Sequence, residues 1–89
     1  MDFEWFEAKR LRTLKDRGLD FRDACRLFDG RPIFTYPSPR EGEDRFVSVG
    51  LLENRFVAVV WMERDGALRI ISMRRARHGE ERAYQAILG

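Results

Sequence analysis

Residues 55–73 read RFVAVVWMERDGALRIISM and set the architecture expected of this chain. Two runs, Arg55–Arg64 and Ala67–Met73, are rich in the β-branched and apolar residues that favour strands. Between them, Asp65-Gly66 is a strong signal for a two-residue hairpin turn, because such turns need a positive φ at both positions. These residues therefore predict an antiparallel hairpin.

The sequence before this hairpin predicts further strands of the same sheet. Arg45–Leu52 alternates loosely between apolar and polar residues, and Glu53-Asn54 provides a turn into the hairpin. Ile33–Tyr36 follows a proline and can only be an edge strand or an extended arm. Pro37–Asp44 is too polar and proline-rich to be anything but a solvated loop. An antiparallel meander of three to four strands follows.

The first third of the chain predicts two helices. Glu7–Arg17 places Ala8, Leu11 and Leu14 on one stripe, and Gly18 stands where a C-cap glycine belongs. Asp20 is a good N-cap for the second helix. The spacing of a buried helix face is then followed by Phe21, Ala24, Cys25 and Phe28.

The remaining pattern completes the expected fold. Glu80–Leu88 has apolar residues on one face and predicts a short final helix. The order of elements is that of an α+β domain: two N-terminal helices, the meander and a C-terminal helix, with the helices packed on one sheet face. A chain of 89 residues, 44% of them hydrophobic, forms one core, so residues 1–89 are expected to be a single domain.

Composition argues against several classes of protein. One cysteine, Cys25, and one histidine, His78, offer no disulfide and no metal site, and no glycine-rich phosphate loop is present, so no cofactor is expected. Cys25 is expected in the core and His78 in an exposed junction. The longest apolar run, Phe56–Met62, is far short of the about 20 residues that span a bilayer. The acidic first residues are unlike a signal peptide, which indicates a cytoplasmic protein without a membrane partner.

Arginine dominates the charge. The net charge is only +2, but the cations concentrate in two stretches, Lys9–Arg17 and Gly66–Gly79. The second stretch contains no acid, and its cations are Arg69, Arg74, Arg75 and Arg77. Four arginines where a strand becomes a helix suit a phosphate ligand. The alternative is internal pairing with Glu63, Asp65, Glu80 and Glu81.

The first predicted helix adds to this basic surface. Lys9 and Arg12 share a face, which either extends a phosphate track or is simply solvated. Trp5 and Phe6 precede the helix, and each could stack on an unpaired base or close the core. Arginines on the backbone and aromatic rings on the bases would together bind single-stranded RNA.

Three blocks of sequence resemble the BrnT family of type II toxins. They are residues 3–9 (FEWFEAK) with residues 15–21 (KDRGLDF), residues 43–50 (EDRFVSVG), and residues 69–76 (RIISMRRA) followed by Glu81, Arg82 and Tyr84. Two departures stand out. Asp16-Arg17-Gly18 occurs where many members read Lys-His-Gly, which removes a histidine, and Met73 occurs where alanine is common.

The resemblance implies a RelE-like ribonuclease that depresses translation. It also implies a partner antitoxin, BrnA, from the same operon, which connects the toxin to operator DNA. The positions that carry over are Lys9, Lys15, Arg45, Arg74 and Arg75, and beyond them Glu63, Arg69 and Tyr84.

The mechanism expected on this basis is metal-independent attack of a ribose 2′-OH on the adjacent phosphorus. Arg74 and Arg75 would stabilise the phosphorane, and Arg45 or Arg69 would hold a flanking phosphate. Glu63 or a lysine with a lowered pKa could be the base, and Tyr84 could donate a proton. The rival interpretation is a non-catalytic arginine-rich module that binds nucleic acid or an acidic partner.

Overall fold

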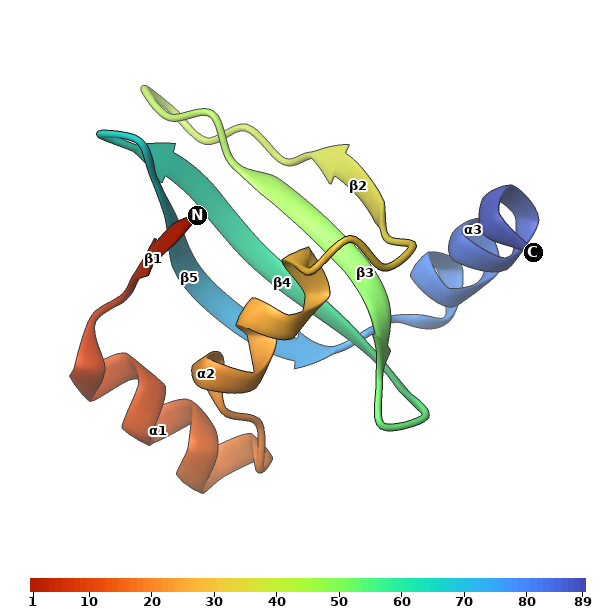
Figure 1. The fold of residues 1–89 in the computed structure, drawn as a ribbon, viewed down its shortest axis with the longest axis horizontal. Helices are drawn as coiled ribbons and strands as arrows, with labels where there is room; N and C mark the ends of the chain where they lie inside the picture. The colour runs from red at the N-terminus through yellow and green to blue at the C-terminus, as the bar shows by residue number, and fades with distance from the viewer.

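A computed structural model of residues 1–89 contains five strands, three α-helices and one 3₁₀ helix (Figure 1). In chain order they are β1 (Asp2–Glu4), α1 (Glu7–Arg17), α2 (Phe21–Ala24), the 3₁₀ helix η1 (Cys25–Phe28), β2 (Phe34–Pro37), β3 (Phe46–Leu52), β4 (Arg55–Arg64), β5 (Ala67–Arg75) and α3 (His78–Leu88). The α+β class, the strand meander and the final helix agree with the sequence prediction.

All five strands form one sheet in the order β1-β5-β4-β3-β2. The β4–β5 hairpin turns at Asp65 and Gly66, whose φ angles are 51° and 81°, as the sequence predicts. β1 is a correction to the predicted meander, because it adds a fifth strand that pairs in parallel with the start of β5. The sheet is therefore mixed rather than purely antiparallel.

A β-bulge in β5 changes which side chains share a face. Trp61 pairs with Ile70 and Val60 pairs with Ser72, so Ile71 is an extra residue opposite the partner strand. Before the bulge, Ile70 lies on the main core face, and after it Met73 lies there. From the alternation of a regular strand we expect Arg69, Ile71 and Met73 to share one face, and the bulge makes this expectation wrong, because Met73 lies on the main core face and Arg69 on the other.

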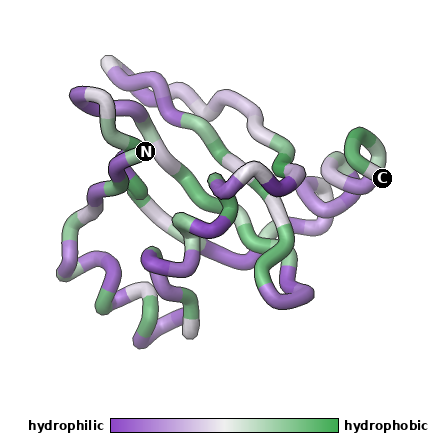
Figure 2. The backbone as a smooth tube through the Cα atoms, in the orientation of Figure 1, coloured by the Kyte–Doolittle hydropathy of each residue, from purple (hydrophilic) through white to green (hydrophobic).

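Helices cover both faces of the sheet, not one face as predicted. On the first face, Phe21 and Leu27 from α2 and η1 pack with Val59 and Ile70 in the main core. On the second face, α3 contacts β2 and β3. Its Tyr84 packs against a smaller core, which consists of Val47, Val49 and Ala58. Figure 2 shows long hydrophobic segments along the central strands, whereas hydrophilic residues predominate along α1. This arrangement leaves part of the second face open beside α3.

Helix α1 has the predicted bounds but turns a different side inward. Leu11 and Leu14 are 52% and 38% exposed, whereas Arg10 and Thr13 are buried. Arg10 pairs with Glu7 at 2.6 Å and with Asp20 at 3.2 Å, so its charge is compensated where it is buried. At the other end of the helix, Arg17 donates to the Met73 carbonyl at 2.8 Å, which fixes α1 along β5. The apolar stripe is a solvent-facing surface.

The second predicted helix is also shorter than expected. Asp20 caps it by accepting from the Arg22 amide, but only Phe21–Ala24 is α-helical before the chain tightens into η1. This tightening brings Leu27 into the core in place of Phe28, which is only partly buried. Cys25 is partly buried beside the same core.

Candidate functional site

The open part of the second sheet face is a groove of about 330 Å³. It is lined by Lys9, Tyr36, Ser38, Arg40, Arg45, Val47, Val60, Ile71, Ser72, Arg74 and Arg77. No acidic residue is among them, and we call this surface the basic groove. Its cations come from α1, the β2–β3 loop, the strand β5 and the start of α3, so only the folded chain brings them together.

A second hollow, of about 450 Å³, continues from the basic groove along α1. It is lined by Phe6, Ala8, Lys9, Arg12, Thr13, Asp16, Arg17 and Ser72, and we call it the helix hollow. Lys9 and Ser72 line both spaces, so the two form one continuous surface.

Arg74 is held in the basic groove by a buried carboxylate. Its guanidinium donates to Glu80 Oε1 at 2.7 Å and to Glu80 Oε2 at 3.0 Å. Glu80 also accepts from the Tyr36 hydroxyl and from the Arg77 amide, so it joins β2, β5 and α3. Burial by itself raises the pKa of Glu80, but these hydrogen bonds outweigh it and lower the pKa to about 2. The carboxylate therefore stays ionised and keeps Arg74 in one orientation.

The β5 bulge is what turns Arg74 toward this groove. Arg74 pairs with Ala58, which faces the smaller core, whereas Arg75 pairs with Val57 on the main core face. The two neighbouring arginines therefore lie on opposite faces of the sheet, and only Arg74 lines the groove.

Lys9 occupies the junction of the basic groove and the helix hollow. Partial burial of its ammonium lowers its pKa, and the nearby charges of Arg45, Arg17 and Arg12 lower it further. Lys9 forms no salt bridge, whereas Arg45 pairs with Glu43 at 2.8 Å. A lysine in such surroundings gives up its proton more readily than an exposed one.

The structure brings together five of the residues that the sequence singled out. Four line the basic groove and one lines the adjoining hollow: Lys9, Arg45, Arg74 and Arg77, and then Arg12. Arg69 lies on the same sheet face but pairs with Glu4 at 3.1 Å and stacks on Phe6. Of the two interpretations of the arginine cluster, internal pairing is observed at Arg74, which bonds to Glu80 while lining the groove, and phosphate binding stays a prediction.

Five other candidates lie outside the groove. Arg75 is on the opposite face, Lys15 is on the exposed side of α1, and Glu63 is beside Phe28 and Trp61 in a separate hollow. Tyr84 packs against the Phe56 ring in the smaller core, with ring centroids 5.2 Å apart. Trp5 packs against Phe21 in the main core and donates to Glu7 at 3.0 Å.

Sequence reasoning did not assign a site role to Tyr36 or Ser72, and it considered Glu80 only as a pairing partner. The capping position of Glu80, three residues after Arg77, was the available signal. Ser72 has no such signal, because its face depends on the bulge.

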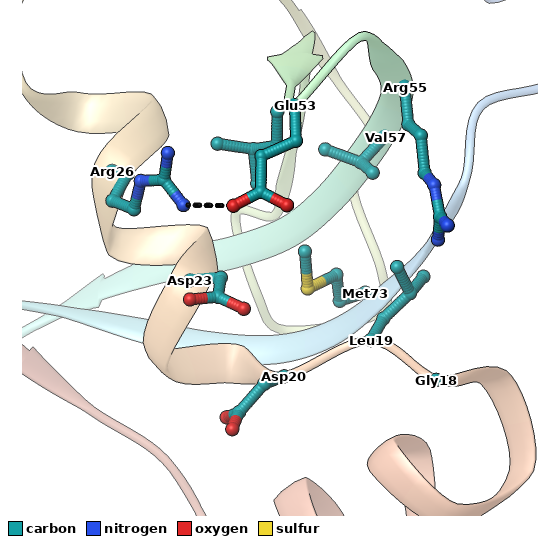
Figure 3. Close-up of a pocket in the computed structure, with 10 residues that line it drawn as sticks. Gly18, Leu19, Asp20, Asp23, Arg26, Glu53, Arg55, Val57 and Met73 are labelled. Atoms are coloured by element: carbon teal, nitrogen blue, oxygen red, sulfur yellow. Dashed lines mark hydrogen bonds and ion pairs between the residues drawn. The ribbon is translucent and has the colours of Figure 1, made fainter.

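A third hollow, of about 130 Å³, lies on the other face and has a different character (Figure 3). Asp20, Asp23 and Glu53 line it, and Arg26 pairs with Glu53 at 3.2 Å. It is smaller and more acidic than the basic groove, which makes it unsuited to a phosphate chain. No group of three or more histidine, cysteine or acidic residues is arranged to hold a metal ion. None of the helices has the length and apolar character needed to cross a bilayer.

A sheet-face groove lined by five cations and no acid is suited in charge to an anionic polymer. Residues 5–80 match the family model described as "Ribonuclease toxin, BrnT, of type II toxin-antitoxin system". The chain belongs to this family, which confirms the resemblance noted from its three sequence blocks. Membership implies an RNA target and an antitoxin partner. No curated protein sequence matches the chain.

Proposed function

We propose that this chain is a RelE-like, metal-independent endoribonuclease that halts growth by cleaving RNA needed for translation. The observation that carries the proposal is the basic groove, which five cations and no acid line, although Arg74 and Arg45 pair with Glu80 and Glu43 beside it. In a family of ribonuclease toxins, such a groove is suited to the phosphodiester backbone of RNA.

The reaction is transfer of the phosphorus to the neighbouring 2′-oxygen. The ribose 2′-oxygen loses its proton and bonds to phosphorus, the bond from phosphorus to the 5′-oxygen breaks, and that oxygen takes a proton from water. The products are a 2′,3′-cyclic phosphate and a 5′-hydroxyl. Arg74, fixed by Glu80, and Arg45 stabilise the charge that develops on the phosphorane oxygens. Arg77 and Arg12 hold the phosphates on either side.

Lys9 is the base in this proposal. Burial and the charges of Arg45, Arg17 and Arg12 lower its pKa, which favours the neutral amine that would accept the proton of the 2′-hydroxyl. The cleavage rate therefore rises with pH until Lys9 is fully deprotonated. Glu63, the other base suggested by the sequence, lies outside the basic groove.

The antitoxin in this proposal is a BrnA-like protein, and operator DNA is reached only through it. Two routes to inhibition are compatible with the surface. A segment of the antitoxin can pair with β2, which is one of the two edge strands of the sheet, or an acidic helix can lie across the basic groove.

The test compares wild type with Arg74→Ala, Arg74→Lys and Arg75→Ala on a single-stranded RNA in excess EDTA. Arg75→Ala is the matched control, because it removes the same charge from the neighbouring residue on the opposite face. Wild type and Arg75→Ala are expected to cut and leave cyclic phosphate ends, whereas Arg74→Ala loses at least tenfold in rate. Arg74→Lys keeps a cation beside Glu80, so its fold is less affected than that of Arg74→Ala. Circular dichroism checks that each variant is folded.

Other outcomes discriminate between the interpretations. Cleavage that disappears in EDTA and returns with a divalent cation contradicts metal independence. RNA binding that depends on salt without any cleavage supports the non-catalytic binding module instead.

A further inference from the structure

Phe6 occupies a position that neither capping nor burial explains. It is the N-cap residue of α1, and its side chain makes no capping hydrogen bond. Serine, threonine, aspartate and asparagine are the usual N-caps, because their side chains accept from the free amides of the first turn. At the same time Phe6 is 66% exposed. At this position the chain therefore has neither a side chain that caps the helix nor an aromatic ring that packs in the core.

The ring is nevertheless held in a fixed place. The guanidinium carbon of Arg69 lies 4.2 Å from the centroid of the ring, and Arg69 is itself bound to Glu4 at 3.1 Å. The Phe6 carbonyl accepts the Lys9 and Arg10 amides at 3.0 and 3.1 Å, which anchors the backbone below the ring. A cation supported by a carboxylate thus backs the ring, while its exposed part lines the helix hollow.

The surroundings of the exposed ring are those of a nucleotide chain. Lys9, Arg12 and Arg17 line the same hollow, and Asp16 is its only acid. Arg17 donates to the Met73 carbonyl and Lys9 is the proposed base, which leaves Arg12 to hold a phosphate beside the ring. Lys9 also lines the basic groove, so a backbone held there continues directly past Phe6.

We propose that Phe6, backed by Arg69, is a platform on which one unpaired base of RNA stacks while Arg12 holds the adjacent phosphate. This inference rests on the proposed ribonuclease function and adds to it a base subsite beside the scissile phosphate. Stacking on an aromatic ring requires a base free of its pairing partner, so the substrate is single-stranded at this position. The platform also discriminates against a paired helix, whose bases are stacked on one another.

Trp5 does not provide such a platform. Its ring packs against Phe21, with centroids 6.5 Å apart, and its indole nitrogen donates to Glu7. Of the two aromatic residues ahead of α1, only Phe6 lines the hollow.

The experiment measures the affinity of the full chain for a short single-stranded RNA whose 2′-hydroxyls are methylated, so that it is bound but not cut. Phe6→Ala is expected to weaken binding about 5- to 150-fold, since stacking contributes about 1–3 kcal/mol per base. Phe6→Tyr, which keeps the ring, stays within about threefold of wild type. Leu11→Ala is the matched control, because Leu11 is an exposed apolar residue of the same helix outside the hollow.

A series of oligonucleotides, each with one base removed, tests for stacking directly. Wild type is expected to lose affinity when the base at one position is missing, and Phe6→Ala is expected to be insensitive at that same position. This coupling between ring and base is not produced by a purely structural role. A fully paired RNA of the same length is bound equally by wild type and Phe6→Ala.

The possible failures are distinguishable. Equal affinity of wild type and Phe6→Ala for every oligonucleotide overturns the platform, even when wild type cleaves RNA and Arg74→Ala does not. If wild type neither binds nor cleaves RNA, the proposed function is overturned and the platform with it.

Discussion

Glu80 shows how much of the site depends on one side chain. It is buried, and it binds Arg74, the Tyr36 hydroxyl and the Arg77 amide at once. The charge of this buried carboxylate is compensated by Arg74 alone, so removing Arg74 would leave a buried charge without its partner. Glu80 therefore acts on the groove through Arg74 without itself lining it.

We expect Glu80→Gln to lower stability at neutral pH by about 2–4 kcal/mol and to flatten its acid dependence. Folding lowers the pKa of Glu80 from 4.5 to about 2, so its contribution is full above pH 4.5 and is lost as the pH falls toward 2. That difference corresponds to about 3 kcal/mol in wild type. Urea unfolding at a series of pH values measures both effects.

The comparison isolates Glu80, because the other carboxyls with a pKa near 2, Glu7 and Asp29, are present in both proteins. An identical acid dependence in wild type and variant would contradict the assignment.

At Phe6, in contrast, a substitution is expected to raise the free energy of unfolding. Phe6→Asp supplies the missing cap of α1 and places a negative charge at the helix N-terminus. We expect the free energy of unfolding to rise by about 0.5–2 kcal/mol while the affinity for single-stranded RNA falls. Thermal unfolding and RNA titration of the same sample measure both. A variant that gains stability and keeps full affinity would show that the ring has no role in binding.

Among the elements, those with local signals were predictable. The φ angles at Asp65 and Gly66, the Asp20 cap and the left-handed Gly18 are all consequences of short-range chemistry. Strand β1 had no such signal. Its three residues are too few to show the alternation of a strand, and its partner β5 lies some sixty residues away in the sequence. Helix placement on the two faces also depends on distant contacts.

Helix α1 shows why the periodicity of a short helix does not define its buried side. Leu11 and Leu14 repeat correctly, but the Arg10–Asp20 pair and the Arg17 contact with β5 orient the helix instead. We expect Leu11→Ala and Leu14→Ala each to cost less than about 1 kcal/mol. Leu27→Ala, in the core, is expected to cost about 2–5 kcal/mol, as a buried leucine does. Chemical denaturation of the three variants checks this, and a large loss at Leu11 would contradict the orientation of α1.

For the whole molecule, the net charge is a poor guide to binding. The chain carries only +2, yet five of its cations line one groove, and several of its acids lie in the hollow on the opposite face. The sequence could identify the arginine-rich segments, but it could not show that α1, the β2–β3 loop and β5 bring Lys9, Arg45 and Arg74 together. That convergence results from the tertiary fold.

This asymmetry predicts a measurable salt dependence. With four to five phosphates held by the groove and the helix hollow, the logarithm of the association constant for single-stranded RNA should fall against the logarithm of salt with a slope of about −3. Arg45→Ala should reduce the slope by about 0.7, whereas Arg75→Ala on the other face should leave it unchanged. Titrations between low and moderate salt measure it. Equal effects of the two substitutions would mean that RNA does not follow the groove.

The extra residue in β5 decides which arginine reaches the groove. If all residues of β5 were kept but the strand were regular, alternation from Arg69 would place Arg75 on the groove face and Arg74 on the core face. Deleting Ile71 itself would instead leave a regular strand in which Ser72 still pairs with Val60, so Arg74 would still face the groove. A sequence one residue shorter at this point would therefore present the same arginine, although an alignment would show a gap there.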